Sequence, residues 1–306
     1  MTRHFPPCYL APAMAAELVR RGAEARRALA ACRLCPRACG VNRLAGETGF
    51  CRAGADAMVA SFGPHFGEER PLVGRNGSGT IFFSHCNLRC NFCQNYEISH
   101  LGEGRGASAA QLAAIMMALQ EMGCHNINLV TPSHFVPQIL AGLVLAVDQG
   151  LRLPLVYNSG GYDSLRALAW LDGVVDIYMP DFKFWDAQVA QETCQAPDYR
   201  RRACAAIAEM HRQVGDLVLG TDGLARRGLL LRHLVLPDDL AATDRVMAWV
   251  VRHLSPDTYV NVMGQYRPCG RAGEVPALGR RPRSDEIRAA VAAARAAGLR
   301  RLDNPH

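Results

Sequence analysis

Three cysteines close together are the first residues of this chain whose types and spacing suggest chemistry. They lie in HCNLRCNFCQNYEIS, residues 85–99, as C-x3-C-x2-C at Cys86, Cys90 and Cys93. A structural zinc site takes four protein ligands, and iron–sulfur clusters usually take four cysteines. Three thiols in one loop therefore predict a [4Fe-4S] cluster with one iron open to a substrate or cofactor. His85 is a weaker candidate for a fourth ligand, because it adjoins Cys86 at the end of a predicted strand.

A second set of cysteines precedes the first. Cys32, Cys35, Cys39 and Cys51 form C-x2-C-x3-C-x11-C in a segment rich in glycine and proline. That segment has too few apolar residues to fold alone, so a bound metal is expected to stabilise it. An all-cysteine set suits either zinc or a second [4Fe-4S] cluster, and unligated thiols remain a third reading.

Apolar strands alternate with amphipathic helices over most of the chain, after a first predicted helix at 12–31. This alternation is typical of a parallel sheet, and six units are too few for an eight-fold barrel. We therefore predict an α/β fold, a partial (β/α)6 TIM-like barrel at 76–306, after an N-terminal helix and four-cysteine metal-binding domain at 1–75. The predicted strands are 80–85, 127–131, 153–159, 174–180, 229–237 and 259–264, and the helices are 108–122, 134–149, 163–171, 198–214, 239–254 and 284–297.

In such a barrel the loops that follow the strands build the active site. The three-cysteine loop directly follows the first predicted strand, so it is expected at this mouth. The loops at 131–134, 158–163, 181–185 and 264–268 follow later strands and are expected beside it.

Composition limits the class of protein. The 306 residues carry a net charge of +6, which suits an anionic ligand but does not indicate nucleic-acid binding. Among 34 basic residues only Lys183 is a lysine, which suggests a position that needs a compact ammonium group. No signal peptide and no run of about 20 apolar residues is evident, which predicts a cytoplasmic protein without a membrane span. Twelve cysteines in that setting favour metal ligation over disulfides.

The three-cysteine loop resembles the radical S-adenosylmethionine superfamily, in which an aromatic residue precedes the third cysteine, here Phe92. The resemblance implies that S-adenosylmethionine chelates the open iron and that Phe92 packs near its adenine. It further implies that one-electron reduction cleaves the sulfonium to a 5′-deoxyadenosyl radical, which abstracts hydrogen from a substrate.

Later motifs resemble the activating enzymes of glycyl-radical enzymes. They are Asp181-Phe182-Lys183, the R-x-x-V-x-P of 232–237 and the N-x-M-G of 261–264, where Asn261 stands in place of the His of the family motif. The resemblance implies that Asp181, Lys183, Arg232 and Asn261 help to hold S-adenosylmethionine, with Lys183 near its carboxylate. It also places the loop that begins with Asn158 and Ser159 near the ribose.

One motif departs from the superfamily. Where many members carry Gly-Gly-Glu for the cofactor amine, this chain has Thr131-Pro-Ser-His134, so Ser133 or backbone carbonyls are the substitutes. Over nearly the whole chain the resemblance is to the PflX-type branch, named as like pyruvate-formate-lyase-activating enzyme. The matching stretches are CPRACGVNR, GETGFC, PHFGEE, GSGTIFFSHCNLRCNFCQN, TPSH, NSGGY and MPDFK.

The resemblance implies a radical enzyme that acts on a small molecule and takes electrons from a one-electron reductant such as flavodoxin or ferredoxin. The first alternative is an activase that installs a glycyl radical on a partner protein. The second is a non-catalytic zinc or iron–sulfur protein. Release of 5′-deoxyadenosine separates the enzymes from the non-catalytic protein.

Overall fold

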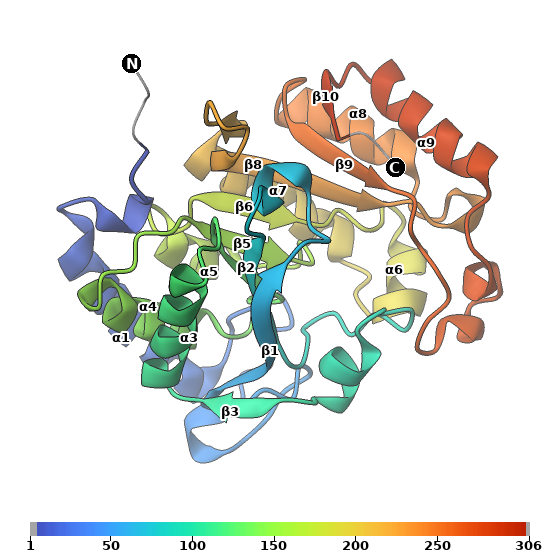
Figure 1. The fold of residues 1–306 in the computed structure, drawn as a ribbon. Helices are drawn as coiled ribbons and strands as arrows, with labels where there is room; N and C mark the ends of the chain where they lie inside the picture. Colours follow the sequence, from blue (N-terminus) through green and yellow to red (C-terminus); the bar gives the residue numbers. More distant parts are fainter. Residues whose placement is uncertain (1–4, 304–306) are drawn as a thin grey trace.

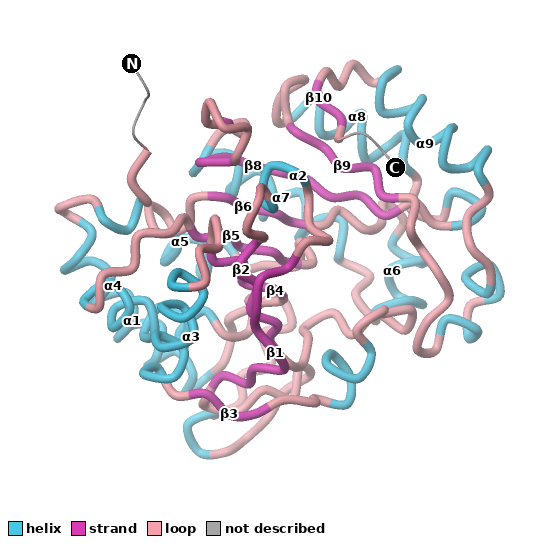
Figure 2. Tube along the Cα trace, viewed as in Figure 1, coloured by secondary structure: helices cyan, strands magenta, loops and turns pink. Residues whose placement is uncertain are grey.

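The structure is a computed structural model and describes residues 5–303. The outermost residues of the two predicted domains, 1–4 and 304–306, lie outside the described part. Helices and strands alternate as predicted, and Figure 2 shows the strands gathered in the middle of the molecule. The strands are β1 Ala57–His65, β2 Ser78–Phe83, β3 Arg105–Ala107, β4 Ile127–Val130, β5 Leu155–Ser159, β6 Ile177–Pro180, β7 Val218–Leu219, β8 Ala225–Leu234, β9 Tyr259–Met263 and β10 Arg301–Leu302.

The helices include the seven that were predicted, together with α2 and α6, which were not. They are α1 Met14–Arg27, α2 Arg70–Val73, α3 Ala109–Glu121, α4 Val136–Asp148, α5 Leu165–Leu171, α6 Ala187–Cys194, α7 Tyr199–Val214, α8 Thr243–His253 and α9 Ser284–Ala296. Short helical turns lie at Cys8–Leu10, Ala28–Ala31, Arg43–Ala45, Glu97–Leu101, Pro237–Asp239, Ala272–Glu274 and Pro276–Gly279. None of the helices within 5–303 has the length and apolarity that crossing a membrane requires.

One large, mostly parallel sheet organises the fold. Its strand order is β10-β9-β8-β6-β5-β4-β2-β1-β3, and all neighbours from β2 to β10 are parallel. The α/β prediction is thus confirmed. The described strand order is an open path, with β1 antiparallel to both β2 and β3 at one end.

Strand β1 is an element that the sequence analysis did not predict. Its sequence, AMVASFGPH, contains Gly63-Pro64, which is typical of a turn. It pairs with β2 on one side and β3 on the other, and a register shift interrupts the β2 pairing between Val59 and Ser61. Because β1 precedes residue 76 and β2 follows it, the sheet crosses the predicted domain boundary, which stays a prediction.

The two faces of the sheet are covered differently. One face packs against helices, and α1, α3 and α4 lie side by side there (Figure 1). On the other face, Leu72 of α2 is fully buried in a cluster with Val156, Ile177, Met179 and Leu230, which come from three central strands. The short helix α2 therefore covers part of this face of the sheet, over β5, β6 and β8.

Truncation of Leu72 tests this packing. We expect Leu72→Ala to lower the free energy of unfolding by about 3 kcal/mol, because a fully buried side chain leaves a cavity. Urea denaturation measures the change, with Leu165→Ala as the control, since Leu165 is 54% exposed. Equal losses in the two variants would contradict the buried position of α2.

Candidate functional site

The three-cysteine loop begins at His85, two residues after the last residue of β2, at the carboxyl end of the parallel strands. His85 and Arg89 both have positive φ angles, of 69° and 50°, which turn the loop back over the strand ends. The Leu88 amide donates to Cys86 Sγ at 3.3 Å. Cys86, Cys90 and Cys93 all line one cavity of about 220 Å³. The loop therefore presents its three thiols to a shared space, as the spacing predicted.

The same cavity gathers residues from the ends of β4, β5, β6 and β8. Besides the cysteines, Phe92, Asn158, Ser159, Asp181, Lys183 and Arg232 line it, so nine of the predicted site residues meet there. Phe92 is buried and packs edge-on against Phe184 and Tyr266, with ring centroids 5.9 Å apart in both pairs.

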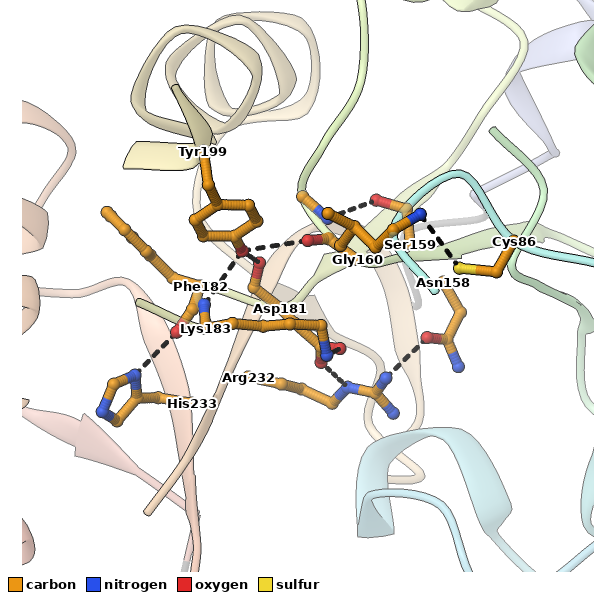
Figure 3. Close-up of polar contacts among 12 residues, drawn as sticks. Cys86, Asn158, Ser159, Gly160, Asp181, Phe182, Lys183, Tyr199, Arg232 and His233 are labelled. Atoms are coloured by element: carbon orange, nitrogen blue, oxygen red, sulfur yellow. Dashed lines mark hydrogen bonds and ion pairs between the residues drawn. The ribbon is translucent and has the colours of Figure 1, made fainter. Parts of the chain in front are cut away.

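Asp181 lies at the centre of an ion-pair network, drawn in Figure 3. One carboxylate oxygen is 2.6 Å from Lys183 Nζ, and the other accepts from Arg232 Nε at 2.9 Å. Arg232 also donates to Asn158 Oδ1 at 2.7 Å, and its guanidinium lies 3.6 Å from Glu68. Two cations are thus held rigidly at the cavity wall by one carboxylate.

Burial and charge act in opposite directions on these groups. Burial alone would raise the pKa of Asp181, but Arg232 and Lys183 hold it below its usual range. Burial alone would lower the pKa of Lys183, but the Asp181 carboxylate raises it above its usual value. All three residues are therefore charged at neutral pH.

The neighbouring backbone is held by Tyr199 of α7. Its hydroxyl accepts from the Lys183 amide and lies 2.9 Å from the carbonyl oxygens of Gly160 and Asp181. Ser159 donates to Asp163. Asn158 accepts from Arg232 (Figure 3), so both predicted ribose contacts have protein partners already. The Asn158 side-chain amide nitrogen makes no hydrogen bond within residues 5–303, and Asn158 lines the cavity.

Thr131 marks the place where the Gly-Gly-Glu motif is replaced. It lines the cavity with a φ of 60°, a left-handed conformation that disfavours a β-branched residue. Its amide donates to the Asn158 carbonyl at 2.8 Å, which helps to hold this geometry. Such strain costs about 1–3 kcal/mol and is typical of functional sites.

Two predicted cofactor residues do not line this cavity. Ser133 is buried, and it lies against Tyr157 and Asp163. Asn261 donates to Glu69 Oε1 at 2.9 Å, where it joins β9 to the segment that precedes α2. The motifs place both residues on the expected segments of the chain. Whether a side chain faces the cavity depends on its direction, which the motifs do not give.

The four-cysteine segment forms a second cavity. Cys32, Cys35, Cys39 and Cys51 all line it, together with Arg43 and His134. Burial raises the pKa of the Cys35 thiol to about 12 and also raises that of Cys51, where the nearby Arg43 acts in the opposite direction. The described residues contain no group of three or more His, Cys, Asp or Glu side chains arranged to hold a single metal ion.

Sequence reasoning missed the residues that join the two cysteine sets. Arg37 donates to the carbonyls of Asn87 at 2.9 Å and Cys194 at 2.6 Å, and it also contacts the Gln195 carbonyl. His134 lies 3.0 Å from the Ser84 carbonyl through Nε2, and its own carbonyl accepts from Arg43 at 2.7 Å. The stretches CPRACGVNR and TPSH contained these residues, but nothing local in them indicates such distant partners.

Comparison with known proteins finds similarity to an archaeal protein. The chain is 31% identical over 268 residues to the uncharacterized protein MJ0674 of Methanocaldococcus jannaschii. The match covers 85% of this chain and 73% of the relative. The chain therefore belongs to the family of this archaeal protein. No family model matches the chain.

Proposed function

We propose that this chain is a radical S-adenosylmethionine enzyme. The observation that carries the proposal is that three cysteines from one loop share a cavity with the Asp181–Lys183–Arg232 network. Three thiols leave one iron of a cubane cluster without a protein ligand. Fixed cations beside that position suit the carboxylate of S-adenosylmethionine.

The residues divide the work as follows. Cys86, Cys90 and Cys93 hold a [4Fe-4S] cluster, and Lys183 and Arg232 attract the cofactor carboxylate. Phe92 packs near the adenine, and the free amide nitrogen of Asn158 meets the ribose. A cluster held there would supply, once reduced, the one electron that cleaves S-adenosylmethionine to methionine and a 5′-deoxyadenosyl radical. The buried cavity wall keeps water away from the site.

The parallel strands β2 to β9 are proposed to form a partial (β/α)6 barrel. Support comes from contacts between the segment just before α2, which leads into β2, and the strands β8 and β9. Glu68 contacts Arg232 of β8, and Glu69 accepts from Asn261 of β9. Both carboxylates precede α2, whose Leu72 packs between the strands. Side chains therefore connect the segment that leads into β2 with β8 and β9, whereas β2 and β9 are not paired in the described sheet.

A small-molecule substrate is proposed because the sequence has no long insertion of the kind that docks a partner protein. The proposed setting is the cytoplasm, with a flavodoxin or ferredoxin as reductant. An activase that acts on a partner protein would use the same cofactor site, so only the identity of the substrate distinguishes it from an enzyme that acts on a small molecule.

The first test is cofactor cleavage. Anaerobically reconstituted protein, reduced with dithionite in the presence of S-adenosylmethionine, is expected to release 5′-deoxyadenosine, which chromatography quantifies. Protein that contains iron and binds S-adenosylmethionine but releases none after reduction would refute the enzyme and favour the non-catalytic alternative.

Lys183 offers a test of cofactor binding. We expect Lys183→Ala to weaken S-adenosylmethionine binding about ten- to hundred-fold, the value of a hydrogen bond to a charged group. Equilibrium dialysis under anaerobic conditions measures the affinity. Arg75→Ala is the control, because Arg75 is exposed and lies outside the cavity. Unchanged affinity in Lys183→Ala would remove Lys183 from the cofactor site.

A further inference from the structure

Arg43 is the most unusual charged residue in the four-cysteine segment. It is only 1% exposed, although it lies in a segment with many exposed neighbours. Its Nε donates to the Gly54 carbonyl at 2.8 Å, and one terminal nitrogen donates to the His134 carbonyl at 2.7 Å. Its other terminal nitrogen is buried without a hydrogen-bond partner.

No carboxylate within residues 5–303 pairs with Arg43. A buried cation without a counter-charge is costly, so a folded chain that keeps one indicates an anion nearby. Besides the two carbonyls and the Phe135 ring, whose centroid is 5.7 Å from the guanidinium carbon, Arg43 meets a thiol: the nitrogen that contacts His134 also lies 3.9 Å from Cys32 Sγ. Four cysteines that bind a metal as thiolates would supply the negative charge that Arg43 lacks.

The arrangement of the four thiols argues against a single zinc ion. Zinc in a tetrathiolate site lies about 2.3 Å from each of four converging sulfurs. Within 5–303 no three His, Cys, Asp or Glu side chains are arranged around one ion position, although Cys32, Cys35, Cys39 and Cys51 line one cavity. A cubane cluster takes four cysteines that lie farther apart, one on each iron.

Hydrogen-bond donors to the cysteine sulfurs also favour an iron–sulfur cluster. The Phe50 amide donates to Cys39 Sγ at 3.5 Å, and Arg43 contacts Cys32 Sγ. Hydrogen bonds to sulfur and nearby charge are the means by which a protein stabilises an anionic iron–sulfur cluster and sets its potential.

We propose that Cys32, Cys35, Cys39 and Cys51 bind a second [4Fe-4S] cluster and that the buried Arg43 supplies its counter-charge. Arg43 is a positioning residue, since its contacts are to Cys32 and to the carbonyls of Gly54 and His134. The proposal does not depend on the chemistry at the three-cysteine loop.

The experiment isolates this site in a Cys86→Ala, Cys90→Ala, Cys93→Ala background. After anaerobic reconstitution with iron and sulfide, we expect about four irons and four sulfides per chain, with the visible absorption of a cubane cluster. One zinc and no sulfide per chain, or no metal at all, would overturn the cluster. Failure of the proposed enzyme activity leaves this result unaffected, because the background already lacks the three-cysteine site.

Variants of Arg43 in the same background test the counter-charge. We expect Arg43→Met to bind the cluster about ten- to hundred-fold more weakly, measured as iron lost to an anaerobic chelator, and to shift the midpoint potential of any cluster retained. Arg33→Met is the matched control, because Arg33 is exposed in the same segment. Arg43→Lys keeps the charge and is expected to keep most of the iron.

Iron retention by Arg43→Met equal to that of its parent would overturn the role of Arg43. If Arg43→Met does not fold, Arg43→Lys serves as the test instead. An Arg43→Lys protein with native circular dichroism but no bound iron would also overturn the role of Arg43.

Discussion

Cys90→Ala is expected to abolish release of 5′-deoxyadenosine while its thermal unfolding, followed by circular dichroism in metal-free protein, stays close to that of the parent. Cys90 is buried and lines the cavity between Cys86 and Cys93 along the loop. Losing one of three thiolates leaves the cluster with two protein ligands, and a [4Fe-4S] cluster requires more than that. Product chromatography and iron content are the measurements.

The control for Cys90→Ala removes a thiol elsewhere. Cys204, on α7, is half-buried and lines neither cysteine cavity, so Cys204→Ala is expected to keep full activity. Cys194 needs a separate variant, because its thiol lies beside Cys90 and each affects the pKa of the other. Full activity in Cys90→Ala, with Cys194 also replaced, would exclude the three-cysteine cluster.

Asp181→Asn is expected to lower the free energy of unfolding by about 3 kcal/mol, because it leaves two buried cations without their shared carboxylate. Lys183 Nζ and Arg232 Nε contact opposite oxygens of Asp181, and these side chains are less than one-fifth exposed. Urea denaturation at neutral pH measures the loss. Asp148→Asn is the control, because Asp148 is exposed at the end of α4.

The pH dependence of this difference follows from the lowered pKa of Asp181. A carboxyl group whose pKa is lower in the folded state stabilises the fold above its unfolded pKa, and this contribution disappears as the pH falls through the folded value. The difference between wild type and Asp181→Asn should therefore be constant above about pH 4, the ordinary pKa of aspartate, and should shrink below it. A difference that grows with acidification would contradict the ion-pair network.

The sequence by itself determined the α/β class, the order of its six repeating units and the residues gathered at the cavity. These features follow from local patterns: apolar periodicity sets strands and helices, and parallel strands place their carboxyl ends at one edge. Lys183 could be selected in this way because it is the lone lysine of the chain and follows a strand. The three-cysteine spacing likewise needed only a short loop to bring its thiols to one cavity.

Only the tertiary structure decided which side chains meet across distant segments. Asn261 turned out to bond Glu69 rather than line the cavity, and β1 formed in spite of its Gly-Pro pair because β2 and β3 supply its hydrogen bonds. Arg43 acquires its significance from burial beside Cys32, whereas most arginines near it in the sequence are exposed. Burial and long-range pairing depend on the whole chain packing together, so a local pattern can place a residue on an element but cannot name its partner.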